Sequence, residues 1–179
     1  YVLADGSLQA VGFDPVRGVL SDEPVSLATG LSLTGNSSAQ FAVAGNGTVA
    51  YMPQEPRSLV FVGRDGTIRE ATTEKRNFHA PMFSPNGQRL VFDFNSADGR
   101  DVWVLGLVDG VLSRATFDRD GHDAVWTPDG SALTYASVKD VVLSVLRIQP
   151  GVPQTSEVLF GSPQLGYSGV WLPDGKDLV

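Results

Sequence analysis

The sequence has no cysteine, no run of basic residues and no long apolar run, and each absence excludes a class of protein. Without cysteine there is no disulfide framework, no thiolate metal site and no thiol nucleophile. A net charge of −7 without a basic stretch argues against a nucleic-acid partner. The apolar runs are far shorter than a membrane span, so we expect no direct membrane insertion of this segment.

What the 179 residues do contain is a large apolar fraction, 42%, with only 18% charged residues, which is typical of a folded and well-buried chain. Twenty glycines and 11 prolines interrupt the chain every few residues and favour many short strands over helices. Residues 138–146 carry apolar side chains at helical spacing, but their β-branched residues and their place in the repeat described next favour a strand.

A short phrase recurs along the chain. Residues 83–92 read FSPNGQRLVF, which is an aromatic residue, a polar turn with Pro-Asn-Gly and an apolar run. The phrase returns at 126–135 and 171–179 and, more weakly, at 43–51, with its glycines at 47, 87, 130 and 175. The steps of 40, 43 and 45 residues, in a strand-rich chain, are typical of β-propeller blades.

A second turn marker, Asp-Gly or Pro-Gly, begins at residues 65, 109 and 150 and keeps the same period. We therefore predict an all-β chain, a β-propeller of four-stranded antiparallel blades with about four blade equivalents. Residues 1–179 would form a single propeller segment, with blade-like units at about 1–31, 41–72, 82–116 and 125–160 and an incomplete unit at 168–179. Open blade edges would then pair with other chains, so we also expect a homo-oligomer.

The phrase followed by an apolar strand and by Asp-Val-Trp-Val-Leu at 101–105 resembles the TolB-like (WD-like) β-propeller repeat. Residues 83–117 and 126–135 carry this resemblance, including 113–117, where the family has an Arg-Leu-Thr ending. The order of motifs at 1–6, 13–15, 23–25, 41–51 and 59–66 is similar to the extracytoplasmic propeller of bacterial membrane-anchored serine/threonine protein kinases.

This resemblance implies a ring of six or more blades, of which the chain would be a fragment in the periplasm or outside the cell. It also implies a non-catalytic module, the sensor part of a bacterial signalling protein, which binds a protein or a small-molecule ligand on a propeller face. No kinase motif stands in these residues, so no kinase residue is assigned. The same propeller occurs in scaffold proteins and before peptidase domains. The alternatives are therefore an accessory substrate-gating propeller of a hydrolase and a self-assembling structural protein.

The two histidines, His79 and His122, stand four residues before the aromatic residue of their phrase, and Tyr167 occupies the same slot before Trp171. Equivalent slots in adjacent blades lie on one rim of the channel, so His79, His122, Asp123 and Tyr167 are the candidate ligand-binding residues. Two imidazoles and one carboxylate are too few ligands for a dedicated metal site, so we expect no metal and no cofactor.

Three further patterns are interpreted as structural. The aromatic residues of the phrase, Phe83, Trp126 and Trp171, are expected to pack between blades. Two groups of acidic and amide residues lack the spacing of a calcium loop and are interpreted as solvated turns; they are Asp93, Asn95, Asp98 and Asp101, and Asp118, Asp120 and Asp123. No serine stands in a nucleophile elbow, so we predict no catalytic residues and no enzyme activity in this segment.

Overall fold

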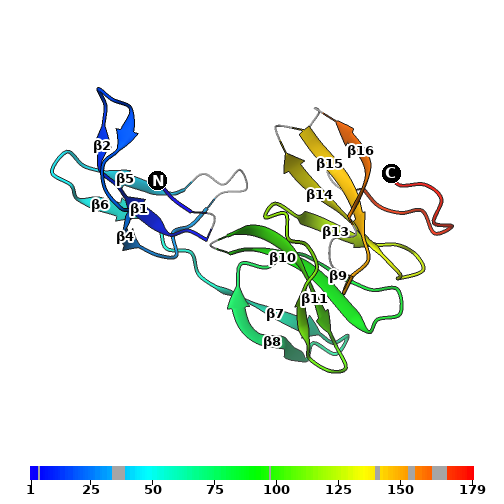
Figure 1. Cartoon of the computed structure of the whole chain (residues 1–179). Coiled ribbons are helices and arrows are strands. Elements are labelled where there is room, and N and C mark those ends of the chain that lie inside the picture. Colours follow the sequence, from blue (N-terminus) through cyan, green and yellow to red (C-terminus); the bar gives the residue numbers. More distant parts are fainter. Residues whose placement is uncertain (4, 34–38, 97, 140–141, 153–155, 163–168) are drawn as a thin grey trace. The chain divides into compact units, whose positions relative to one another are not determined.

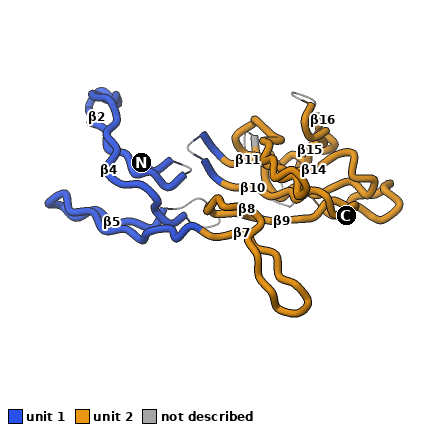
Figure 2. Tube along the Cα trace, turned by 90° about the horizontal axis from the view of Figure 1, so that it is seen from below, with its two compact units in different colours: residues 1–56, 95–99 blue, residues 57–94, 100–179 orange. Residues whose placement is uncertain are grey.

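The computed structural model describes the chain except residues 4, 34–38, 97, 140–141, 153–155 and 163–168. Every regular element in the described part is a β-strand (Figure 1), so the prediction of an all-β chain is confirmed. The chain divides into two compact units, Tyr1–Pro56 with Asn95–Gly99 and Arg57–Phe94 with Arg100–Val179 (Figure 2).

The first unit consists of two-stranded antiparallel sheets. Its hydrogen-bonded pairs are β1 (Leu8–Ala10) with β4 (Val25–Ala28), β2 (Phe13–Asp14) with β3 (Val19–Leu20), and β5 (Phe41–Val43) with β6 (Val49–Tyr51). The chain turns at Asp5 and Gly6 before β1, with Gly6 at a φ of 81°. A Cβ at Gly6 would lie 2.5 Å from the carbonyl oxygen of Leu31, so both the turn and the close approach require glycine.

Two four-stranded blades, each with its strands in chain order, lie in the second unit except for residues Asn95–Gly99 at the turn between the second and third strands of the first blade. The first blade is β9 (His79–Phe83), β10 (Arg89–Ser96), β11 (Gly99–Gly106) and β12 (Leu112–Arg114). The second blade is β13 (His122–Trp126), β14 (Leu133–Lys139), β15 (Val142–Ile148) and β16 (Glu157–Ser162). In the segment with apolar side chains at helical spacing, the described residues 138–139 and 142–146 are thus strand, as its β-branched residues predicted.

Shorter pieces flank these blades. A two-stranded sheet of β7 (Arg57–Val62) and β8 (Ile68–Arg76) precedes the first blade. After the second blade comes the C-terminal segment, residues 169–179, in which Trp171 pairs with Leu178 across the last copy of the phrase.

The recurring phrase forms the turn between the first two strands of a blade. In the second blade Trp126 ends β13, and the hydroxyl of Thr127 donates a hydrogen bond of 2.6 Å to the carboxylate of Asp129. In the first blade the hydroxyl of Ser84 donates to the side-chain oxygen of Asn86 at 2.8 Å. The polar residues of the phrase therefore hold their own turn.

Buried side chains fill the spaces between successive sheets. The interface between the two blades, called the first interface, holds the largest cluster: Val91, Val102, Val104, Ala115, Ala124, Trp126, Leu133, Tyr135 and Ile148. The second interface, between the second blade and the C-terminal segment, holds Ala136, Leu143 and Val145, with Leu178 packed against them. A third cluster with Phe78, Phe92 and Phe94 lies between the β7–β8 sheet and the first blade.

The three aromatic residues of the phrase pack between sheets to different extents. Trp126 is only 5% exposed, in the first interface. Phe83 is 52% exposed, although its ring stacks on Phe61 of β7 with centroids 5.9 Å apart. Trp171 is partly buried and donates its indole N–H to the hydroxyl of Thr134 at 3.1 Å. The shared position in the phrase therefore determines where each ring lies, and the residues of the adjacent sheet determine how deeply it is buried.

Candidate functional site

The predicted site residues lie at the start of the first strand of each blade. His79 begins β9, and His122 and Asp123 begin β13. These two strands are neighbours and are the inner edges of their blades. Tyr167 lies outside the described residues. Nε2 of His122 is 4.0 Å from the carboxylate of Asp123, and the charge of Asp123 also acts on His79.

Both inner strands carry the same irregularity just after the histidine. Ala80 has a φ of 46° and Asp123 a φ of 50°, the left-handed region that residues other than glycine rarely adopt. At the same points the pairing of β9 with β10 and of β13 with β14 shifts its register. A bulge of this kind frees a backbone N–H from the sheet. The N–H of Asp123 donates instead to the carboxylate of Asp93 in the first blade, at 3.0 Å.

Asp93 is the central group of this site. It is fully buried, and it accepts a hydrogen bond of 2.6 Å from Nε of Arg100 as well as the one from the main chain of Asp123. Burial raises the pKa of this carboxyl above its ordinary value, and the Arg100 cation opposes that rise. One carboxylate thus holds an arginine of its own blade and the backbone of the next.

His79 is kept in its neutral form. Burial lowers the pKa of its imidazole, and the positive charge of Arg100 lowers it further. Nε2 of His79 lies 2.9 Å from the side-chain nitrogen of Asn77, which can only donate. Nε2 therefore accepts, and the ring proton stands on Nδ1. The ring proton of His122 stands on the same nitrogen, because Nδ1 of His122 lies 2.8 Å from the carbonyl oxygen of Asp120 and must donate.

We call His79, Asp93, Arg100, His122 and Asp123 the inner-strand cluster. It combines two imidazoles of fixed orientation and a carboxylate from the inner strands β9 and β13 with the Asp93 carboxylate of β10 and the Arg100 cation of β11. Among the described residues no group of three His, Cys, Asp or Glu side chains converges closely enough to hold a metal ion. The contacts that these side chains make are hydrogen bonds and an ion pair.

The interpretation of Asp93 and Asp101 as parts of a solvated turn is wrong. Both are buried, Asp93 by its pairing with Arg100 and Asp101 by its pairing with Arg114. The Asp101 carboxylate also accepts from the hydroxyl of Thr116 at 2.8 Å. A carboxylate that is satisfied in this way can be buried, whereas turn composition alone suggests exposure.

Arg100 and Arg114 are the residues that sequence reasoning missed. A signal for Arg114 was available, because it belongs to the 113–117 motif that the resemblance singles out. For Arg100 the signal is weaker: it stands across a hairpin from Asp93, and only knowledge of the strand ends pairs the two.

Similarity to known proteins is found only in comparisons with solved structures. No protein-family model matches the chain, and no curated protein matches it at a significant level. Among solved structures, TolB from Acinetobacter baumannii is 22% identical with a TM-score of 0.59, over 97% of this chain and 42% of that one. A candidate TolB from Agrobacterium tumefaciens is 15% identical with a TM-score of 0.52, over 88% of this chain and 56% of that one.

These likenesses show a TolB-like propeller fold, and at such identities they show the fold alone. The chain spans about half the length of these TolB structures, 42% and 56%. A candidate 6-phosphogluconolactonase from Bacteroides uniformis is also similar, at 15% identity over 97% of this chain and 70% of that one, but its TM-score of 0.40 is too low to argue from. No helix in the described part of the chain is long and apolar enough to cross a membrane.

Proposed function

We propose that this chain is the non-catalytic binding part of a β-propeller protein, and that its inner-strand cluster recognises a polar segment of another protein. The observation that carries the proposal is the double role of Asp93, which fixes both the Arg100 side chain and the main chain of Asp123. Groups held in place before binding lose little conformational freedom on binding, which favours recognition. The strained backbone at Ala80 and Asp123 supports the same conclusion, since such strain collects at functional sites.

The finer version of this proposal is a sensor in a bacterial signalling protein, outside the cytoplasm. It is supported by the resemblance to kinase-linked propellers and by the TolB-like fold. On this proposal the gene encodes a kinase domain and a membrane span upstream of Tyr1. Sequencing the gene tests this directly, because a peptidase domain beside the propeller would favour substrate gating instead.

A second candidate function is assembly, because one outer strand exposes apolar side chains. Val158 of β16 is 60% exposed and Phe160 is 49% exposed, and β16 is the edge strand of its blade. Such an edge can add a strand from another chain. Light scattering at micromolar concentration distinguishes the two functions: a monomer excludes assembly through β16, and a dimer or larger species supports it.

Selection of binding peptides from a random display library tests the inner-strand cluster. Enriched peptides would be titrated against the wild type and against Asp123→Asn, which keeps the backbone N–H and tolerates the left-handed conformation. We expect at least a tenfold loss of affinity in Asp123→Asn and in His79→Ala. Glu157→Gln removes the same charge as Asp123→Asn from an exposed position on β16 and should change nothing. Equal binding by all three variants, or no enrichment, would overturn the proposal.

A further inference from the structure

The first and second interfaces share a contact between the proline of one phrase and the glycine of the next. The first interface also contains an arginine over its tryptophan, which the second does not have among the described residues. Trp126 and Trp171 hold the same position of the phrase, and so do Gly130 and Gly175. A Cβ at Gly130 would meet the Pro85 ring at 3.4 Å, and one at Gly175 would meet the Pro128 ring at 3.8 Å. In both interfaces the proline of one phrase therefore lies against the glycine of the next.

In the first interface an arginine completes this arrangement. The guanidinium of Arg89 lies 4.3 Å from the centroid of the Trp126 ring and donates a hydrogen bond of 2.7 Å to the carbonyl oxygen of Gly130. A planar cation stacks well on an indole while its N–H groups reach an acceptor at the edge. The molecule thus contains its own example of a guanidinium seated between two phrases.

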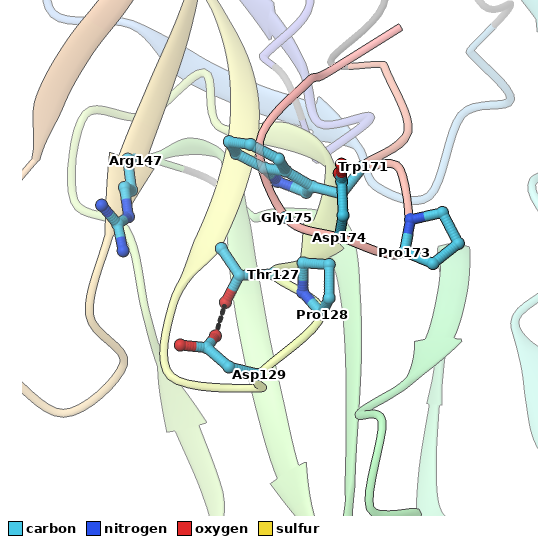
Figure 3. A pocket seen from close by; sticks show the side chains of 8 residues that line it. All are labelled: Thr127, Pro128, Asp129, Arg147, Trp171, Pro173, Asp174 and Gly175. Carbon is cyan, nitrogen blue, oxygen red and sulfur yellow. Dashed lines mark hydrogen bonds between the residues drawn. The ribbon is translucent and has the colours of Figure 1, made fainter.

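In the second interface the position of Arg89 is taken by Ala132, whose side chain ends at a methyl group. A groove of about 430 Å³ remains here, lined by Trp171, Gly175, Pro128, Asp129, Asp174 and Arg147 among others (Figure 3). In contrast to Trp126, Trp171 has no cation over its ring among the described residues.

The charges of the groove favour a cation. A hydrogen bond from Thr127 lowers the pKa of Asp129 to about 2, so this carboxylate is ionised at neutral pH. Asp174 is a second carboxylate in the lining. Arg147 is the opposing charge, and in Figure 3 it stands on β15, across the groove from Pro173 and Asp174. Two carboxylates against one arginine leave the lining negative.

We propose that this groove binds the guanidinium of an arginine side chain on a partner polypeptide. The guanidinium would stack on Trp171 and donate to the Gly175 carbonyl, as Arg89 does with Trp126 and Gly130, and its charge would be balanced by Asp129 and Asp174. The site is separate from the inner-strand cluster, so its test does not depend on that proposal.

The experiment is an NMR titration of the ¹⁵N-labelled chain, with the indole N–H of Trp171 as reporter and the Trp171→Phe variant for its assignment. The probe is acetyl-Gly-Arg-Gly-amide, and the control peptide carries citrulline, which has the shape of arginine without its charge. We expect a saturable shift of the Trp171 signal with the arginine peptide and at least fivefold weaker binding of the citrulline peptide. An unmoved Trp171 signal, or equal binding of both peptides, would overturn the proposal.

Variants of the groove sharpen this test. Asp129→Asn and Asp174→Asn should each weaken the arginine peptide at least threefold, and Arg147→Gln should strengthen it, because a like charge is removed. Ala132→Arg places an arginine at the position of Arg89 and should abolish binding. Because Ala132 is buried, the arginine variant could fail to fold; the Asp129→Asn and Asp174→Asn variants then test the proposal without it. Unchanged affinity in both asparagine variants contradicts the proposal, as does a groove that binds free arginine and not the peptide.

Discussion

The first and second interfaces use the same phrase and the same proline–glycine contact, yet one is filled and the other is hollow. Nine buried apolar side chains close the first, and Arg89 and Asp93 tie its two blades together. Among the described residues, the second is held by three buried side chains with Leu178 packed against them and by a hydrogen bond from Trp171 to Thr134. The phrase thus determines the turn and its place against the neighbour, while the residues that vary between its copies decide whether the interface closes.

The two indole N–H groups show this in detail. Trp171 donates to Thr134, whereas Nε1 of Trp126 is buried and has no hydrogen-bond partner in the described structure. The residue of the first blade that corresponds to Thr134 is Val91, which offers only methyl groups. One side chain therefore separates a satisfied tryptophan from an unsatisfied one.

The largest difference between the interfaces is expected on truncation of their tryptophans. Trp126→Ala should lower the free energy of unfolding by about 4 kcal/mol, the range for a large aromatic side chain removed from a packed core. Trp171→Ala should lower it by only about 1–2 kcal/mol, because its ring is partly exposed. Urea unfolding of both variants measures this, and equal losses would show that the second interface is packed as tightly as the first.

The second-largest loss of stability is expected when the cation that pairs with Asp93 is removed. Arg100→Ala leaves a buried carboxylate without its partner and should cost about 3 kcal/mol at pH 7. Adding Asp93→Asn removes the uncompensated charge, so the double variant should be more stable than Arg100→Ala alone. Urea unfolding of the two variants checks this order, and the reverse order would mean that the pair contributes little.

The pH dependence of two carboxyls should also differ between the interfaces. The pKa of Asp93 is raised above 3.8, so the folded state binds the extra proton and stability from this group falls as pH rises through the raised pKa. The pKa of Asp129 is lowered to about 2, so its contribution is present above pH 3.8 and is lost as pH falls toward 2. Carboxyl ¹³C titration should separate the two groups, and a common midpoint near 3.8 would refute both shifts.

Removal of Arg89 should have a smaller effect. Arg89→Ala loses the stacking on Trp126 and the hydrogen bond to Gly130, and should cost about 1 kcal/mol. Arg89→Lys keeps the charge but not the planar shape, so its stability should lie between those of the wild type and the alanine variant. Urea unfolding ranks the three proteins; a lysine variant as stable as the wild type would show that charge alone matters.

The smallest expected effect concerns the unsatisfied indole. Val91→Thr offers Trp126 an acceptor and should leave the free energy of unfolding within about 0.5 kcal/mol of the wild type, because the new hydrogen bond offsets the burial of a hydroxyl. In a Trp126→Phe background the same change should cost about 1 kcal/mol, since no N–H is present. The double-mutant cycle measures this coupling, and a coupling of zero would mean that the introduced hydroxyl does not reach the indole.

Much of the fold could be predicted from the sequence, because turns and periods are local. The glycines at 87 and 130 stand at left-handed φ values of 68° and 69°, as turn glycines must. The inner-strand cluster could be predicted only in part. The slots of His79 and His122 follow from the repeat, but the Asp93–Arg100 pair depends on a hairpin and on a bulge in the next blade. No local pattern of residues encodes that partnership.

The proline–glycine contact also bears on how such a chain grows. The second blade carries both halves of this contact: its turn glycine, Gly130, receives the Pro85 ring of the first blade, and its Pro128 ring lies against Gly175 of the C-terminal segment. A blade that is copied whole carries both halves of this contact, so a duplicated copy meets its neighbours on either side without a mismatch. The contact has a direction, from the proline of one phrase to the glycine of the next, so a chain could be lengthened by whole units while this proline–glycine contact is kept at each new junction.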